Sequence, residues 1–269
     1  MNPFNPYDYV SLNGDGIMRG VTLALPSERV LGLLPHGLTL GEQSVTPPGT
    51  HPVIVLFNEM LRAHISVPTG LPSLSYHEHS LGVPHSYLTG SALLASGFGN
   101  AGPFYFQPRL HLDDFLATLG GILYWGFSKV MASFTVTDDS YTVISNRGAK
   151  VTSLSLAPSG AFRPIAEMTK FDPIRAMHDQ PIISMLPIAM GPFFVCSSFD
   201  KDWGNGTIRP LQTVTRVDEA YVPGLDTGTF PEAGKAPGID ESVLGSYEMR
   251  LPWRLSMPYP PYAAGFFER

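Results

Sequence analysis

One lysine of this sequence lies where a charged side chain is costly. Lys129 follows the apolar and aromatic run 122–128, Ile-Leu-Tyr-Trp-Gly-Phe-Ser. If the segment is a regular strand, alternation places Lys129 on the same face as Trp125 and Phe127. Burial among such side chains disfavours the ammonium form and lowers the pKa of a lysine. A neutral amine is a nucleophile, so this setting predicts a lysine that forms a Schiff base with a carbonyl compound.

The other four lysines have polar or turn-like surroundings, and we expect them at the surface. They are Lys150, Lys170, Lys201 and Lys235. An ordinary structural role for Lys129 also stays open. Its stem could cover Trp125 while the ammonium reaches water, or the ammonium could pair with a core carboxylate.

A second candidate group is a glutamate between two histidines in the segment 73–85. An extended chain places His77 and His79 on one face and Glu78 on the other. In one interpretation Glu78 points into a barrel as an acid–base group or hydrogen-bond partner, with one histidine nearby. In the other, His77 and His79 bind a metal together with His85, although the HExxH spacing of a helical zinc site is missing.

The elements that position these residues are mostly short strands, because apolar residues recur with period two between Gly, Pro, Asn and Asp. The expected strands are 17–25, 53–57, 63–67, 74–80, 122–136, 141–145, 151–156, 193–199, 207–217 and 246–257. Helical signals are few: 28–34 capped by Ser27, 113–119, and 173–185 with Pro181 in its interior. This ratio predicts a mainly β (α+β) fold, a β-barrel or a sandwich with a few peripheral helices.

Composition sets the class of protein. The 269 residues are 43% hydrophobic and 15% charged, which is typical of a globular protein, and we expect one domain over residues 1–269. The net charge of -6, without a basic cluster, argues against nucleic acid or anionic membrane as a partner. No segment has the length and apolarity of a membrane span, and the N-terminal residues do not form a secretion signal, so we expect a cytoplasmic protein. Cys196 is the only cysteine, which excludes an intramolecular disulfide and cysteine-rich metal frameworks.

Four segments of the chain form an ordered set. They are 33–38 (Leu-Leu-Pro-His-Gly-Leu), 76–78 (Tyr-His-Glu) followed by Pro84, Gly121 followed by 125–130 (Trp-Gly-Phe-Ser-Lys-Val), and 248–252 (Glu-Met-Arg-Leu-Pro). This set resembles the acetoacetate decarboxylase superfamily over most of the chain. In that family the nucleophile lies in an aromatic-Pro-Lys-Lys run after a glycine, and an acidic residue lies in a Tyr-x-Glu segment before a proline.

The resemblance implies roles for individual residues. Lys129 would be the Schiff-base lysine, Glu78 the acidic residue of the pocket, and Arg19 the arginine that orients a substrate carboxylate. The candidate substrate-binding residues are Tyr76, His79, Trp125 and Phe127. The resemblance also implies an antiparallel β-barrel core with a flanking sheet and a site inside the mouth of the barrel. It further implies a homo-oligomer, a small keto acid or other carbonyl substrate, and no cofactor or metal.

Two positions depart from the family pattern. Val130 replaces the second lysine of the pair, so the like charge that helps to activate the family's nucleophile is missing. Ser128 replaces the preceding proline. Four functions remain open: a Schiff-base lyase such as a decarboxylase, an aldolase-dehydratase favoured by Val130, a ligand-binding barrel without catalysis, and a metal-dependent barrel enzyme that uses His77 and His79.

Overall fold

The computed structural model of the chain describes residues 10–67, 70–90, 101–188, 191–218, 227–231 and 235–259. Its strands are β1 (Ser11–Pro26), β2 (Leu38–Leu40), β3 (Thr50–Ile65), β4 (Leu74–Leu88), β5 (Phe104–Phe106), β6 (Leu110–Leu112), β7 (Lys129–Val136), β8 (Ser140–Ser145), β9 (Lys150–Pro158), β10 (Arg163–Pro164), β11 (Ile182–Ile188), β12 (Gly191–Ser197), β13 (Phe199–Lys201), β14 (Thr207–Val217), β15 (Gly228–Phe230) and β16 (Ser246–Ser256). Its helices are α1 (Ser27–Leu31), α3 (Phe115–Trp125) and α4 (Asp172–His178), with the short 3-10 turns η2 (Ile165–Glu167) and η3 (Thr169–Phe171).

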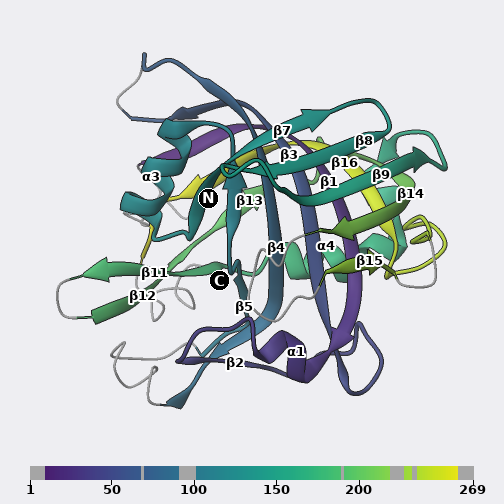
Figure 1. Cartoon of the computed structure of the whole chain (residues 1–269), viewed down its shortest axis with the longest axis horizontal. Coiled ribbons are helices and arrows are strands. Elements are labelled where there is room, and N and C mark those ends of the chain that lie inside the picture. The colour runs from purple at the N-terminus through teal and green to yellow at the C-terminus, as the bar shows by residue number, and fades with distance from the viewer. Residues whose placement is uncertain are drawn as a thin grey trace.

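Nine strands close into a barrel in the order β4, β3, β1, β16, β14, β9, β8, β7 and β6, and β6 pairs back to β4. Neighbouring strands of this ring are antiparallel except β6 and β7, which run parallel and are connected through α3. Figure 1 shows α3 against one side of the barrel, away from the β8–β9 end. The predicted antiparallel barrel is confirmed.

The predicted flanking sheet is also present, and its first strands pair with the second half of β4. The first half of β4 pairs with β6 inside the ring, whereas Val83–Leu88 pair with β5 and β2. Strand β5 then pairs with β11, and β11 with β12. A similar division occurs on β16, whose last residues pair with β13 instead of β14.

The barrel interior is filled with apolar and aromatic side chains. The rings of Phe57 on β3 and Tyr141 on β8 lie 5.2 Å apart, and the Tyr141 hydroxyl donates a 2.8 Å hydrogen bond to the carbonyl oxygen of Asn58. Since β3 and β8 are not neighbours in the ring, these contacts cross its interior. Strands β1, β3, β4 and β16 thus form a wall with two buried faces, one toward the interior and one toward α3.

One predicted strand was wrong in its first half. The segment 122–125 belongs to α3, and β7 begins only at Lys129. The side chain of Asp114 caps α3 by accepting a 2.7 Å hydrogen bond from the backbone N–H of Ala117, and Gly126 ends it with φ 68°, the left-handed conformation that glycine adopts easily. The alternation of apolar residues alone would predict a strand here. The two caps make the first part of the run helical instead.

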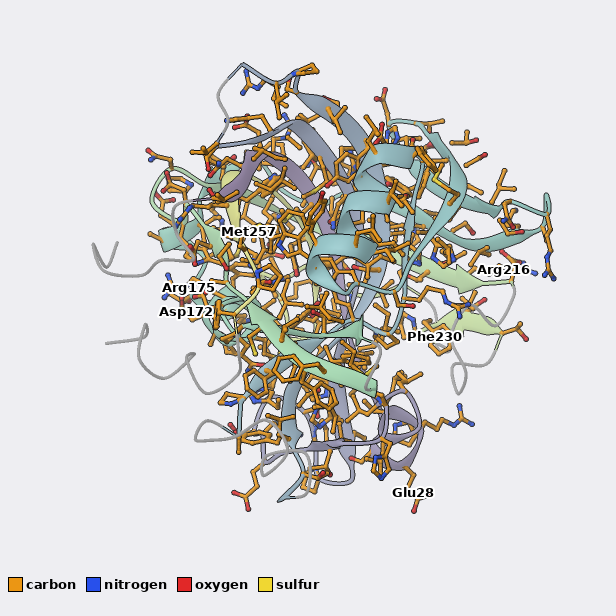
Figure 2. All side chains as sticks on the ribbon, turned by 90° about the vertical axis from the view of Figure 1, so that its left-hand side faces the viewer. Glu28, Asp172, Arg175, Arg216, Phe230 and Met257 are labelled. Atoms are coloured by element: carbon orange, nitrogen blue, oxygen red, sulfur yellow. The ribbon has the colours of Figure 1, made fainter. Side chains whose placement is uncertain are left out.

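Other boundaries also differ from expectation. The two strands 53–57 and 63–67 are one strand, β3, whose register shifts between Met60 and Ala63. Ser27 makes no capping hydrogen bond in α1, and in Figure 2 Glu28 of that helix points into solvent. The third predicted helix ends at His178, and Ile182 begins a strand instead. Among the described residues, no helix has the length and apolarity to cross a membrane.

The filled barrel interior predicts a stability effect. Leu154 on β9 is fully buried there, so Leu154→Ala removes apolar contacts and leaves a cavity. We expect a loss of about 2–5 kcal/mol in the free energy of unfolding, measured by urea titration. Leu31→Ala, at a leucine 47% exposed in α1, is the control and should cost less than about 1 kcal/mol. Equal losses in both variants would contradict this description of the core.

Candidate active site

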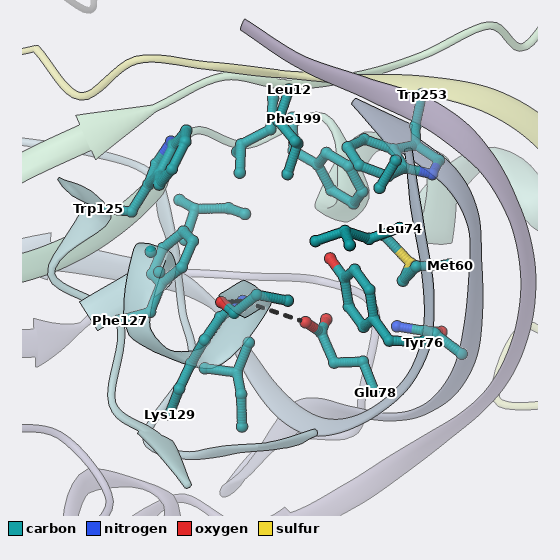
Figure 3. Close-up of a pocket in the computed structure, with 18 of the residues that line it drawn as sticks. Leu12, Met60, Leu74, Tyr76, Glu78, Trp125, Phe127, Lys129, Phe199 and Trp253 are labelled. Atoms are coloured by element: carbon teal, nitrogen blue, oxygen red, sulfur yellow. Dashed lines mark hydrogen bonds and ion pairs between the residues drawn. The ribbon is translucent and has the colours of Figure 1, made fainter. Parts of the chain in front are cut away.

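Lys129 and Glu78 form a buried pair. The Nζ atom of Lys129 lies 3.6 Å from Oε2 of Glu78, and the two side chains are only 7% and 11% exposed. The same Nζ donates a 3.3 Å hydrogen bond to the carbonyl oxygen of Ala117 in α3. Figure 3 shows the two side chains reaching toward each other at one end of a pocket.

The backbone around Lys129 fixes its direction. The left-handed turn at Gly126 reverses the chain after α3, and the N–H of Phe127 bonds back to the carbonyl oxygen of Gly121 at 3.1 Å. Lys129 then begins β7 and aligns with Leu110 of β6. The lysine therefore starts a strand at the point where the barrel ring closes, directly beneath the helix.

A glycine of α3 provides the space for the lysine side chain. A Cβ atom added to Gly121 would lie 2.5 Å from Cδ and Cε of Lys129 and 2.8 Å from its Nζ. Real Cβ atoms essentially never make such short contacts. The absence of a side chain at Gly121 thus lets Lys129 lie against the helix and reach Glu78.

The pair opens into a cavity of about 400 Å³ with mostly apolar walls. This volume is within the range of roughly 300–1,000 Å³ typical of small-molecule sites. Three of the predicted substrate-binding residues, Tyr76, Trp125 and Phe127, line it (Figure 3). Other lining residues come from β1, β3, β13 and β16: Leu12, Met18, Leu56, Met60, Phe199, Trp253 and Leu255.

Burial shifts both members of the pair toward their neutral forms. Desolvation lowers the pKa of Lys129, and the Glu78 charge and hydrogen bond only partly oppose it. Desolvation likewise raises the pKa of Glu78 against the opposing effects of Lys129 and of a hydrogen bond from Asn58. Since no cation adjoins Lys129 along the chain, desolvation is the cause of its lowered pKa.

Tyr76 is a further polar residue at the Lys129–Glu78 end of the cavity. Its ring lies 5.9 Å from Nζ of Lys129, and its hydroxyl points into the cavity in Figure 3. Desolvation, followed by the charges of Glu78 and Asp114, raises the pKa of Tyr76 well above its ordinary value. The phenol therefore stays protonated and can donate a hydrogen bond to a bound ligand.

Arg19 and His79 do not line the cavity, contrary to their predicted roles. Each directly follows a residue that does line it: Arg19 follows Met18 on β1, and His79 follows Glu78 on β4. Arg19 pairs with Glu59 at 2.7 Å, and His79 is fully buried with Nδ1 2.9 Å from the carbonyl oxygen of Leu56. Side-chain alternation sends both toward the barrel interior.

The same alternation corrects the expected position of the site. Glu78 does not point into the barrel: it faces the opposite side of β4, toward α3. His77 faces the interior side, where its ring stacks on Phe134 at 5.7 Å and its Nδ1 lies 2.7 Å from Asp113. Within the described ranges no three His, Cys, Asp or Glu side chains form a group that could hold a metal ion.

Lys201 is a cavity residue that the sequence analysis placed wrongly at the surface. It is 7% exposed and lines the cavity together with Phe199. The flanking residues Asp200 and Asp202 made it look solvated. Alternation on β13 was the signal available, because it puts Lys201 on the same face as Phe199 and Trp203.

The chain has an acetoacetate decarboxylase-like fold. Three solved structures with this architecture are similar to the chain. The enduracididine biosynthesis enzyme MppR, complexed with the condensation product of pyruvate and imidazole 4-carboxaldehyde, has a TM-score of 0.60 and 14% identity over 93% of this chain and 89% of its own. Acetoacetate decarboxylase from Legionella pneumophila subsp. pneumophila str. Philadelphia 1 has a TM-score of 0.55 and 13% identity over 93% and 85%.

The third structure is an acetoacetate decarboxylase-like enzyme from Sphingomonas wittichii RW1, with a TM-score of 0.55 and 13% identity over 93% of both chains. No protein-family model matches the chain, and no curated protein sequence matches it either. At this identity the likeness establishes the fold.

The space at Gly121 predicts a position-specific effect. Gly121→Ala should push the lysine side chain away from α3, and a displacement of about 1 Å can lower the rate of a positioned group about 100-fold. We expect reductive methylation of Lys129 by formaldehyde and cyanoborohydride, mapped by peptide mass spectrometry, to slow at least about tenfold. Gly120→Ala is the matched control, because nothing lies within 4 Å of its added Cβ. Equal rates in the two variants would show that Gly121 does not position the lysine.

Proposed function

We propose that this protein is a Schiff-base-forming lyase acting on a keto acid or a related carbonyl compound. The observation that carries the proposal is a buried amine, Lys129, held 3.6 Å from a buried carboxyl group in an apolar cavity. The acetoacetate decarboxylase-like fold of the chain supports it. One similar solved structure is an acetoacetate decarboxylase, and another is complexed with a condensation product of pyruvate.

The first step needs one proton in the right place. When Lys129 and Glu78 share a single dissociable proton, the neutral form places it on Glu78 and leaves a free amine on Lys129. The amine nitrogen adds to the carbonyl carbon, and the oxygen takes the proton from Glu78. Loss of this oxygen as water, after a second proton transfer from the nitrogen through the carboxylate, gives the iminium. The raised pKa of Glu78 suits a group that donates and accepts protons near neutral pH.

The iminium then accepts an electron pair. In a β-keto acid, the bond between the α-carbon and the carboxylate breaks, CO2 leaves, and the electrons form an enamine. Glu78, a carboxylate at this stage, takes up a proton from solvent and passes it to the enamine carbon; hydrolysis then releases the product and restores Lys129. The apolar walls disfavour the substrate carboxylate more than the uncharged CO2, which favours this step. The lysine is itself the electron sink, so the scheme uses no separate cofactor.

An aldol condensation with dehydration is the second candidate. It uses the same enamine, which adds to the carbonyl carbon of a second molecule and then loses water. Val130, in place of a second cation, and a cavity of about 400 Å³ both suit a larger, less charged substrate. The similar MppR structure holds a condensation product of pyruvate with an aldehyde.

We also propose that the enzyme acts in the cytoplasm as a homo-oligomer of single-domain chains. One helix face supports the oligomer. Phe115, Leu116, Leu123 and Tyr124 of α3 are each about 60% exposed, an unusual set for a solvated helix. A second copy of the chain packed on α3 would cover them.

Trapping with borohydride tests the proposed nucleophile. Incubation with a ketone followed by reduction should add the ligand mass at Lys129 in the wild type and leave the cavity of Lys129→Met unlabelled, because the proposed nucleophile is then absent. Lys150→Met, at an exposed lysine, is the control and should trap like the wild type. A Lys129→Met protein that still gains the mass in its cavity would reject the assignment.

The pH dependence of adduct formation tests Glu78. In the wild type the rate should rise with pH as the pair loses its first proton and fall again as it loses the second. In Glu78→Gln the acid is gone, so the rate should drop about 100-fold and show no fall at high pH. With the carboxylate removed, the pKa of Lys129 should fall further, since Glu78 raises it in the wild type.

Glu59→Gln is the matched control for this profile. Glu59 is the next carboxylate on the neighbouring strand, but it pairs with Arg19 and does not line the cavity. Its variant should keep the two-sided profile. A two-sided profile in Glu78→Gln would assign the proton transfers to another group.

A further inference from the structure

A second buried cation lies in the same cavity. Lys201 is 7% exposed, and its Nζ donates hydrogen bonds to the carbonyl oxygens of His178 at 2.7 Å and Phe199 at 2.9 Å. An ammonium group has three N–H donors, so one remains for a bound ligand. Lys201 is thus a lining residue with an available donor.

No carboxylate among the residues that the structure describes makes an ion pair with Lys201, and the two acceptors of its Nζ are neutral carbonyl groups. The charges of Asp179 and Asp200 act on it from farther away: burial lowers the pKa of Lys201 to about 8, and these two carboxylates partly oppose that effect. Asp179 accepts from the Trp203 indole at 2.8 Å, and Asp200 is mostly exposed. A buried cation without a direct ion-pair partner is costly, and a bound anion would reduce that cost.

Lys201 lies at the other end of the cavity from the reactive pair. Its Nζ is 4.3 Å from the centre of the Phe199 ring, and Figure 3 shows Phe199 across the pocket from Lys129. The intervening walls are apolar and include Leu12, Leu74 and Met60 (Figure 3). The part of the cavity between the two amines is therefore apolar.

A second polar group belongs to the Lys201 end. Tyr105 is 4% exposed, lines the cavity, and has no hydrogen-bond partner for its hydroxyl among the described residues. Its ring stacks on that of His178 at 6.1 Å, the residue whose carbonyl oxygen Lys201 binds. An ammonium N–H and a phenol O–H in one apolar end suit the oxygens of a carboxylate.

The Lys129 end cannot take that role as well. Lys129 already has Glu78 as its counter-charge, so the pair is neutral as a whole, and Arg19 is paired on the far face of β1. We propose that Lys201, assisted by Tyr105, binds a carboxylate of the substrate at the end of the cavity opposite Lys129. The substrate is then an oxo acid whose reacting carbonyl and retained carboxylate are separated by an apolar chain. This inference rests on the proposed function for the carbonyl end only.

A binding measurement without a reactive carbonyl tests the anion site by itself. Octanoate should bind the wild type, by isothermal titration calorimetry, about tenfold to a hundredfold more tightly than octan-1-ol, because a charge-assisted hydrogen bond contributes that much. Lys201→Met should remove the preference, and Lys201→Arg should keep most of it. Octanoate binding that is equal in the wild type and Lys201→Met would overturn the proposal.

Trapping connects the two ends of the cavity. With borohydride, 7-oxooctanoate should label Lys129 at least about tenfold faster than octan-2-one at low concentration, and Lys201→Met should lose this difference. Lys201→Arg, which keeps the charge, should keep most of the difference, and urea titration of both variants shows that they are folded. A wild type that traps neither ketone but still prefers octanoate through Lys201 would reject the proposed chemistry and keep the anion site. Labelling at Lys201 instead of Lys129 would overturn the assignment of the two amines.

Discussion

The site depends on the exclusion of water from one amine and one carboxyl group. In water a lysine and a glutamate at 3.6 Å would be a weakly interacting ion pair. Inside the cavity each loses solvation, and the neutral forms become accessible to both. This constraint replaces the neighbouring cation, which Val130 does not supply. The apolar residues of the cavity wall therefore lower the pKa of Lys129 by keeping solvent away.

Helix α3 holds the buried pair in position. It covers the pair, accepts a hydrogen bond from Lys129 at the carbonyl oxygen of Ala117, and leaves room for the lysine stem at Gly121. Its capping residues, Asp114 and Gly126, fix where the helix ends and where β7 begins. The position of Lys129 is thus set by local helix signals as much as by the barrel.

Sequence reasoning reached the barrel, Lys129 and Glu78, because charged residues in apolar alternating runs are rare and visible. It could not decide which face of a strand looks toward the barrel interior, since both faces of the shared wall are buried. Arg19 and His79 were placed in the site by the family resemblance, which does not show which face of a strand a residue occupies. Lys201 was missed because neighbouring aspartates in the sequence say little about a side chain that points the other way. The helical start of 122–136 depended on two caps, Asp114 before the apolar run and Gly126 within it.

The two-sided wall has a consequence for how this protein can change. Successive residues of β4 serve different purposes: the odd positions fill the barrel and hold the fold together, and the even positions near Glu78 line the cavity. A substitution on the ligand side leaves the interior packing untouched. Selection, or a protein engineer, could therefore reshape the chemistry of such a strand one residue at a time while the scaffold keeps its stability.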